Sequence, residues 1–542
     1  MTPATACVSG APMADRRRLS GGTDRTAAAE RRIAVAGWGL ALAAALAVYG
    51  ATMAPDLVWQ DAGDYQWQAA RMNLSRPGDA VRVHPFYVVV AHGLGRIGVW
   101  NYARGASVAS AVGTALAVAN VWLLVWLLMR RPWPATVAAL VCMLAHTVWQ
   151  QGVQPQTYGW SNAAMSGMLV LAVAHARTGR IRWLLVLALV GGVGLSVHLM
   201  SQLALAVLGV WVVWRMIRRD VPAWVLPAGL GLWLLGGGLF WYVVWGEVVR
   251  TGEIAAALES AFIGRWGSAV FNVTGLPRML LRSVLMFVLN FPTLLVLLGF
   301  WGLWRSRRAW PRMPHAALLA AVLVVYVLFA VRYRVPNQNF FFTPVYVLAA
   351  VYIGVGVGSV TWARRPAAMA AILTAALLVV PAYWVMMRTA RATGFNLKAG
   401  RPVRKIPYRD DYVYYLLPWQ TGNDGARRFA EEALDSLPRG AVLFADSTSR
   451  PPLLCVQKLE GRRPDVRLVA SDGLSPETVA RYWGSKEDLL AEFAAEGRRV
   501  FIVSDHPAYM PAWMAEHARR VPFGIVFEAT EKAGGPPAGE AK

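Results

Sequence analysis

The stretch Trp59-Gln60-Asp61-Ala62-Gly63-Asp64-Tyr65-Gln66-Trp67-Gln68 follows directly after the first long apolar run of the chain, and His84-Pro85 comes soon after it. It therefore starts at a membrane surface if the apolar run crosses a membrane. In a helix, Asp61 and Asp64 lie on one face, because residues three apart are neighbours there. Carboxylates at the edge of a bilayer are costly and tend to mark function. We therefore expect this acidic pair to belong to a functional site within a membrane scaffold.

Composition indicates a polytopic membrane protein. Of the 542 residues, 56% are hydrophobic and 16% are charged, against about 25% charged residues in ordinary soluble domains. A net charge of +23 would suggest nucleic acid in a soluble protein. Here the arginines cluster in short loops between apolar runs, as the positive-inside rule expects, so we expect no nucleic-acid partner. Cys7, Cys142 and Cys455 are too far apart to indicate a disulfide framework or a metal site.

The apolar runs predict about eleven spans, with the N-terminus inside and the C-terminus outside. Residues 1–32 are polar and Arg-rich, which favours a disordered cytoplasmic tail. Residues 33–388 form the expected transmembrane domain, and its first outer loop, 55–104, carries the acidic pair. A helix at 85–100 is expected to lie along the outer surface, because it is short for a span. Single spans are expected at 134–150, 224–245 and 279–304, among others.

The composition becomes that of a soluble protein after residue 388. Residues 389–424 are aromatic and of mixed charge, which is typical of a linker near the membrane. A helix is expected at 425–436 and buried strands at 441–445, 466–470, 500–503 and 525–527. Strands alternating with helices predict a small parallel α/β domain over 425–529, outside the membrane. The tail, 530–542, is expected to be disordered. The predicted fold class is thus a polytopic α-helical membrane protein with a small extracytoplasmic α/β domain.

Several polar residues at the outer ends of spans are further candidates for a site. His84 lies one loop from the acidic pair and could hydrogen-bond a hydroxyl or a phosphate, although a lone histidine is often structural. Arg332 and Arg334 lie outside, against the bias of the other arginines, and Arg suits phosphate geometry; anchoring to lipid headgroups is the alternative. The remaining candidates at outer span ends are Gln156, Thr157, Tyr158, His198 and Gln202. The acidic pair itself could instead be solvated loop carboxylates or a helix N-cap.

Sequence motifs exclude several classes of protein. The chain has no Walker loop, no GxSxG, no HExxH and no dinucleotide fingerprint, which argues against an ATP-driven pump and a metalloprotease. No Asp-x-Asp stands in the outer loop, so a divalent metal is not favoured and no cofactor is expected.

The order of these features resembles the GT-C superfamily of integral-membrane glycosyltransferases. More closely, it is similar to the protein O-mannosyltransferase-like transmembrane family, whose first loop reads roughly Asp-Ser-Gly-Glu and then His-Pro-Pro-Gly-Tyr-Pro-Leu-Tyr. The matching segments here are Asp61-Ala62-Gly63-Asp64, His84-Pro85-Phe86-Tyr87, Gln156-Thr157-Tyr158, Phe341-Phe342-Thr343-Pro344, Leu437-Pro438-Arg439-Gly440-Ala441-Val442-Leu443-Phe444 and Leu459-Glu460-Gly461-Arg462-Arg463-Pro464-Asp465-Val466.

The departures from the family pattern favour one carboxylate. Asp64 and Gln156 each stand where the family has Glu, and the Gly-Tyr-Pro after His84-Pro85 is lost. Asp61 is therefore the safer candidate for the essential carboxylate. A second acidic role at Gln156 does not follow.

The resemblance implies a glycosyltransferase of the inner or plasma membrane that uses a polyprenyl-phosphate-linked sugar on the extracytoplasmic face. Asp61 would activate the acceptor hydroxyl, Asp64 would assist, and Arg332 or Arg334 would hold the lipid phosphate. The other expected substrate-binding residues are His84, Tyr87, Gln156, Tyr158 and His198. Mannose is the family default. The acceptor could be a protein, a lipid or a glycan, and membrane lipids are further partners.

Two other classes share the same outline. A transporter or flippase of a lipid-linked glycan would have similar spans and outer polar residues, but transporters often show internal repeats, and none is obvious here. A non-catalytic receptor would use the outer domain to bind a partner and would tolerate alanine at the acidic pair. An enzyme releases polyprenyl phosphate, whereas a transporter only moves its cargo.

Overall fold

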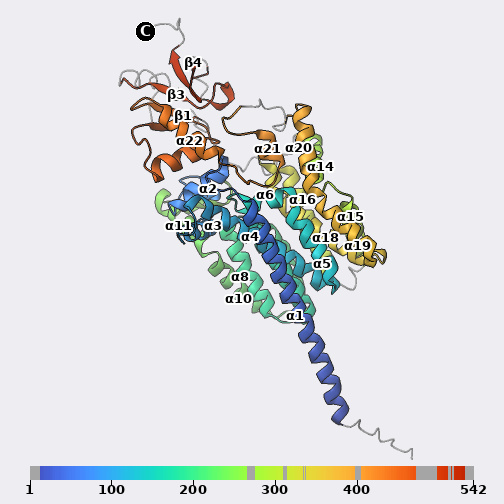
Figure 1. Ribbon diagram of the computed structural model, residues 1–542. Coiled ribbons are helices and arrows are strands. Elements are labelled where there is room, and N and C mark those ends of the chain that lie inside the picture. Colours follow the sequence, from blue (N-terminus) through green and yellow to red (C-terminus); the bar gives the residue numbers. More distant parts are fainter. Residues whose placement is uncertain are drawn as a thin grey trace, which may run out of the picture.

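The structure is a computed structural model that describes residues 13–264, 275–308, 314–333, 335, 337–396, 405–471, 497–510, 514–515 and 518–531. A large helical part and a smaller part with a β-sheet make up the described chain (Figure 1). The sheet and helix α22 (Gly425–Ser436) lie at one end of the helical part, beside α2 (Gln60–Ala70). Helix α1 (Met13–Thr52) projects from the opposite end (Figure 1).

The helices of the helical part follow the apolar runs of the sequence. After α2 they are α3 (Pro85–Gly95), α4 (Tyr102–Met129), α5 (Pro132–Leu144), α6 (His146–Val153), α7 (Tyr158–Thr178), α8 (Arg182–Val197), α9 (Ser201–Ile217), α10 (Val225–Gly236), α11 (Gly238–Thr251), α12 (Ile254–Phe262), α14 (Leu276–Asn290), α15 (Leu295–Arg307), α16 (Pro314–Arg332), α17 (Gln338–Phe341), α18 (Thr343–Ser359), α19 (Pro366–Leu377) and α20 (Val379–Ala392). Within 1–32, for which we expected disorder, the chain is helical from Met13 onward, and residues 1–12 lie outside the described residues.

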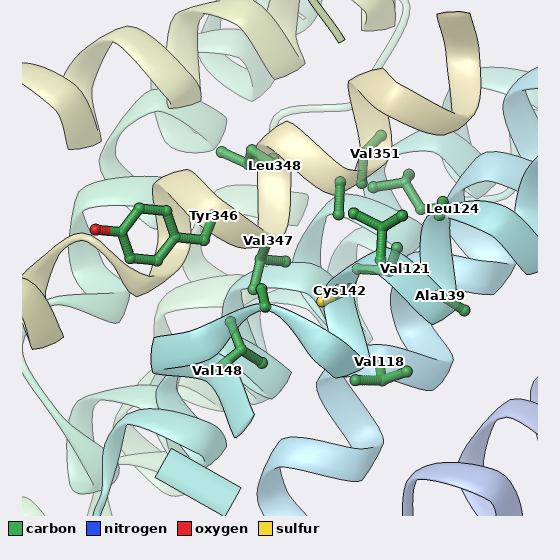
Figure 2. Packing of buried hydrophobic residues seen from close by; sticks show 14 of the residues in the cluster. Val118, Val121, Leu124, Ala139, Cys142, Val148, Tyr346, Val347, Leu348 and Val351 are labelled. Atoms are coloured by element: carbon green, nitrogen blue, oxygen red, sulfur yellow. The ribbon is translucent and has the colours of Figure 1, made fainter. Parts of the chain in front are cut away.

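Helix α4 lies at the centre of the helical part and packs against α1, α3, α5 and α7. Its buried positions before Val118 are Ala, Gly, Ser and Thr, and such small residues let helix backbones approach closely in a membrane. Its later buried residues are larger. Figure 2 shows Val118, Val121 and Leu124 gathered with side chains of α5, α6 and α18 in one packed cluster.

Three expected single spans are each two helices in the structure, joined at a sharp bend that the sequence prediction did not include. Helices α5 and α6 meet at 66°, α10 and α11 at 69°, and α14 and α15 at 111°. The second break falls at Gly236-Gly237-Gly238, where glycine weakens a helix, and the third falls at Asn290-Phe291-Pro292, where proline cannot continue one. Apolar composition alone does not record such bends.

The described residues contain three helices that are long and apolar enough to cross a membrane, or up to six when each bent pair counts as one span. Five shorter apolar helices accompany them, including α3. Large apolar side chains are exposed on several helices, for example Leu230 and Leu235 on α10 and Leu281 and Val284 on α14. Extended apolar surface of this kind is typical of contact with lipid. The number eleven stays a prediction.

The C-terminal part has a mixed sheet with strand order β2-β1-β3-β5-β4. The strands are β1 (Val442–Ala445), β2 (Arg467–Ala470), β3 (Val500–Ile502), β4 (Ala518–Phe523) and β5 (Val526–Glu531). Strands β2, β1 and β3 are parallel, as expected. The expectation of an all-parallel sheet is wrong for β5, which is antiparallel to both β3 and β4. A turn at Gly524, with φ +57°, joins β4 to β5, and strands joined by so tight a turn must be antiparallel.

Candidate active site

Helix α2 forms at the predicted stretch and carries the acidic pair. Its first turn follows Trp59, which has extended backbone and a fully buried side chain. The buried face of α2 includes Ala62, Gly63 and Gln66. A Cβ at Gly63 would lie 2.3 Å from the Val58 carbonyl oxygen, so only glycine fits there. Packing of this face leaves Asp61 and Asp64 partly exposed on the other side.

Two arginines of the loop between α2 and α3 surround the acidic pair. Arg82 Nη2 lies 3.8 Å from Asp61 Oδ1 and 4.0 Å from Asp64 Oδ2, and Arg82 Nη1 lies 3.5 Å from Asp79 Oδ2. Arg76 forms an ion pair with Asp64. The positive charge of Arg82 therefore lies among three carboxylates. Arg76 adds a second positive charge beside Asp64.

The two carboxylates of the acidic pair differ in how firmly they are held. Asp64 has the direct ion pair with Arg76 and is 27% exposed. Among the described residues, Asp61 has the longer contact with Arg82 and accepts a hydrogen bond of 2.8 Å from Asn337 Nδ2, and its side chain is 47% exposed. Asp61 is thus the carboxylate with oxygen surface left for a substrate.

The surroundings of Asp61 increase its basicity. Protein atoms that surround the carboxyl group of Asp61 raise its pKa by desolvation, although part of the side chain stays exposed. The negative charge of Asp64 raises this pKa further. Arg82, Arg76 and the Asn337 hydrogen bond act in the opposite direction but leave the pKa above its ordinary value. A carboxylate with a raised pKa is a better proton acceptor near neutral pH.

His84 and His198 stack beside the acidic pair, with ring centroids 4.9 Å apart and an angle of 11°. His84 Nδ1 lies 2.9 Å from the Val197 carbonyl oxygen, which can only accept, so Nδ1 carries the proton. His198 Nδ1 accepts a hydrogen bond from Met200 N, so its proton is on Nε2 when the ring is neutral. Burial lowers the pKa of His84 well below its ordinary value and that of His198 to about 4. The neutral pair therefore offers one acceptor and one donor nitrogen.

Aromatic side chains enclose this histidine pair. The Tyr65 ring lies 5.6 Å from His84, and the Tyr158 ring lies 5.1 Å from His198. Tyr158 also contacts Phe340 and Phe341 of α17. Aromatic walls with a few polar groups are typical of sites for small molecules.

Tyr87 and Gln156 are buried inside the protein. The Tyr87 hydroxyl donates to the Ala106 carbonyl oxygen at 2.8 Å and lies 3.1 Å from Ser110 Oγ. Ser110 Oγ also accepts from Gln156 N at 2.8 Å and lies 3.0 Å from Gln156 O. Tyr87 is fully buried and its hydroxyl is already hydrogen-bonded, so it supports the packing around the site and has no free group for a substrate.

Of the two arginines at the end of α16, the structure describes one. Arg332 lies in the last turn of α16, and Arg334 lies outside the described residues. The same connection brings Asn337 to Asp61. A role for Arg332 or Arg334 in binding phosphate stays a prediction.

Sequence reasoning missed Arg76 and Arg82. A signal was present, since both lie in the loop that we expected to be the first outer loop, against the expected inside bias of the other arginines. Among the residues that the structure describes, no group of three or more His, Cys, Asp or Glu side chains could hold a metal ion. Independence from metal stays a prediction.

Comparisons with known proteins identify the fold. No protein-family model matches the chain, and no curated protein matches its sequence. A crystal structure of ArnT from Cupriavidus metallidurans bound to undecaprenyl phosphate has a TM-score of 0.57 at 15% identity, over 91% of this chain and 98% of that chain. The apo state of that ArnT has a TM-score of 0.57 at 17% identity, over 92% and 98%.

A crystal structure of the Archaeoglobus fulgidus oligosaccharyltransferase in complex with Zn and sulfate is more distant, with a TM-score of 0.48 at 14% identity, over 85% of this chain and 67% of that chain. We argue only from the ArnT structures. At 15% and 17% identity the likeness shows the fold alone: the chain has the same overall fold as that ArnT.

Proposed function

We propose that the protein is a membrane glycosyltransferase that moves a sugar from a polyprenyl-phosphate donor to an acceptor hydroxyl, with Asp61 as the base. The observation that carries the proposal is the unequal acidic pair: Asp61 has an open face and a raised pKa, whereas Asp64 is held by Arg76. The fold supports the donor class, because the ArnT of the same fold was crystallised with undecaprenyl phosphate.

In this mechanism Asp61 accepts the proton of the acceptor hydroxyl. The freed oxygen attacks the anomeric carbon of the sugar, and the bond from that carbon to the phosphate oxygen breaks. The electron pair leaves with the polyprenyl phosphate, whose charge is met by arginine. Arg82 beside the acidic pair is one candidate, and Arg332 or Arg334 is the other. His84 and His198 would hydrogen-bond sugar hydroxyls through their Nε2 atoms, beside the Tyr158 ring.

The finer assignments follow from the family resemblance. Mannose is the proposed sugar, and the acceptor is a hydroxyl of a protein, lipid or glycan. The site faces the extracytoplasmic side, since the acidic pair follows the first apolar run and that run begins after Arg31-Arg32. The N-terminus is then cytoplasmic, and the sheet-containing domain is extracytoplasmic.

The test is release of polyprenyl phosphate by purified protein given polyprenyl-phosphate-mannose and an extract of extracytoplasmic acceptors. Wild type is compared with Asp61→Asn and with Asp220→Asn as a matched control. Asp220 follows α9, and its carboxylate pairs with Arg215 in the last turn of that helix. We expect release from wild type and Asp220→Asn, and loss of release in Asp61→Asn. Full release by Asp61→Asn would contradict the proposal. If no donor sugar supports release but vesicles show movement of a lipid-linked glycan, the protein is a transporter.

A further inference from the structure

The loop that leads into the acidic pair belongs to the hydrophobic core of the C-terminal domain. Leu57 and Trp59 are fully buried in one cluster with Phe429 of α22 and Phe501 of β3. The Trp59 and Phe429 rings lie 5.3 Å apart, and Figure 1 shows α22 beside α2. Trp59 precedes Asp61 by two residues, so the start of α2 is fixed inside a domain that is remote in sequence.

The backbone between Trp59 and Asp61 has an unusual conformation. Gln60 has φ +62°, in the left-handed region that non-glycine residues rarely occupy. Its N–H donates to the carbonyl oxygen of Thr448 at 3.1 Å, in the loop after β1. Such a conformation costs about 1–3 kcal/mol and persists only where the surroundings hold it. Here the partner that holds it comes from the C-terminal domain.

The side chain of Gln60 is held by the segment that precedes this domain. Gln60 Nε2 donates to Tyr415 Oη at 3.3 Å, and the same oxygen accepts from Arg409 Nη2 at 2.6 Å. Arg409 is itself buried against the rings of Tyr414 and Tyr415 and lies 2.8 Å from Asp411. Both the backbone and the side chain of Gln60 are therefore bound from outside the helical part.

An ion-pair network joins the same two parts of the chain. Arg427 of α22 donates to Asp56 with two nitrogens and to Glu460 with two, and the Tyr102 hydroxyl donates to Glu460 at 2.8 Å. Asp56 lies just before Leu57, and Tyr102 begins α4. Several ionised groups bonded in one network at a partly buried interface hold geometry better than an isolated surface pair does.

We propose that the C-terminal domain positions Asp61 for catalysis, through the Thr448 carbonyl on Gln60 and the Arg427 network on Asp56. These are positioning residues, since none of them touches the reacting atoms. The proposal rests on the proposed function, because the group that is positioned is its base. It assigns the domain a role in turnover, beyond any role in binding acceptor.

The first test compares two substitutions at Gln60. Gln60→Pro fits the extended backbone of Trp59 and the first position of a helix, but it removes the N–H and forbids φ +62°. Gln60→Gly keeps the backbone N–H and allows φ +62°, and like the proline variant it lacks the glutamine side chain. We expect kcat to fall about 100-fold in the proline variant, as for a misplaced catalytic group, with donor KM unchanged. The glycine variant should keep kcat within about threefold, a loss of one hydrogen bond or less.

The second test compares two arginines of the domain. Arg427→Gln removes the link to Asp56, whereas Arg462→Gln removes ion pairs with Asp435 and Glu431 that stay inside the domain. Hydrogen exchange of the backbone amides of residues 57–70 measures how firmly α2 and the segment before it are held, and it needs no substrate. We expect faster exchange in Arg427→Gln and wild-type exchange in Arg462→Gln. A purely structural role would lower the yield of folded protein equally in both and leave kcat per folded molecule unchanged.

The outcomes separate this inference from the proposed function. A folded Gln60→Pro variant with wild-type kcat overturns the inference while the proposed function stands. If that variant does not fold, the kcat and the hydrogen exchange of Arg427→Gln test the inference instead, and wild-type values of both overturn it. If wild type releases no polyprenyl phosphate, the proposed function fails, and unchanged exchange in Arg427→Gln then overturns the positioning role as well.

Discussion

Helices α2 and α4 are neighbours, but they are held by different kinds of contact. Helix α4 packs mainly through alanine, glycine and serine against α1, α3 and α7. Helix α2 is held by ion pairs, hydrogen bonds and a buried tryptophan, from residues as distant as Asn337, Thr448 and Phe429. Close packing of small side chains contributes mainly to the stability of α4. The ion pairs and hydrogen bonds around α2 are directional, so they fix the orientation of its side chains. Substitutions in α2 should therefore act on turnover and those in α4 on stability.

The largest effect is expected for Asp61→Asn. Loss of a general base lowers the rate by about 100- to 10,000-fold, while the hydrogen bond with Asn337 can be kept by the new amide oxygen. The measurement is kcat with polyprenyl-phosphate-mannose, together with the thermal midpoint of unfolding. A large fall in the midpoint would contradict the contrast between the two helices.

The next effect concerns packing of α4. A Cβ at Gly105 would lie 2.4 Å from the Cα of Gly95 at the end of α3. Gly105→Ala should therefore destabilise the protein by about 1–3 kcal/mol, as overpacking does, with little change in kcat per folded molecule. Gly39→Ala on α1 is the matched control, because a Cβ there meets nothing within 4 Å. Equal thermal midpoints for the two variants would show that this close approach is unimportant.

A smaller effect is expected where α4 meets α3 and the segment before α7. Ser110 of α4 bonds the backbone of Gln156 and the hydroxyl of Tyr87. Ser110→Ala should lower the free energy of unfolding by about 1 kcal/mol, the usual cost of a lost hydrogen bond. Thermal unfolding measures it, and Ser107→Ala on the same helix is a control. A fall in kcat without loss of stability would mean that Ser110 acts on the site directly.

The smallest effect is expected in the pH profile. Asp61 accepts a proton only when ionised, so turnover is lost as the pH falls through its pKa, which burial raises. Asp64 raises this pKa further and Arg82 lowers it. The acid limb of kcat/KM should therefore move to lower pH in Asp64→Asn and to higher pH in Arg82→Gln. Shifts in the same direction, or none, would mean that another group controls the limb.

Local patterns in the sequence predicted much of the chain. The helix over Gly425–Ser436 forms at the expected residues, and strands form at all four expected positions. The stretch after the first apolar run is helical, with both carboxylates of the acidic pair near Arg82. These features depend on the spacing of residues close together in the chain, which the sequence records directly. The hairpin at Gly524 was missed because β4 has exposed and charged residues.

Only the tertiary structure decided how the site is assembled. The sequence by itself determined the apolar helices, the acidic pair and the composition of the C-terminal domain. It did not determine that Arg82 lies among three carboxylates, that His84 stacks on His198, or that Thr448 holds Gln60. Most of these contacts join residues that are distant in the chain, and they form only after helices bend and domains pack. Their energies depend on distance and burial in the folded chain, which no local pattern of side chains encodes.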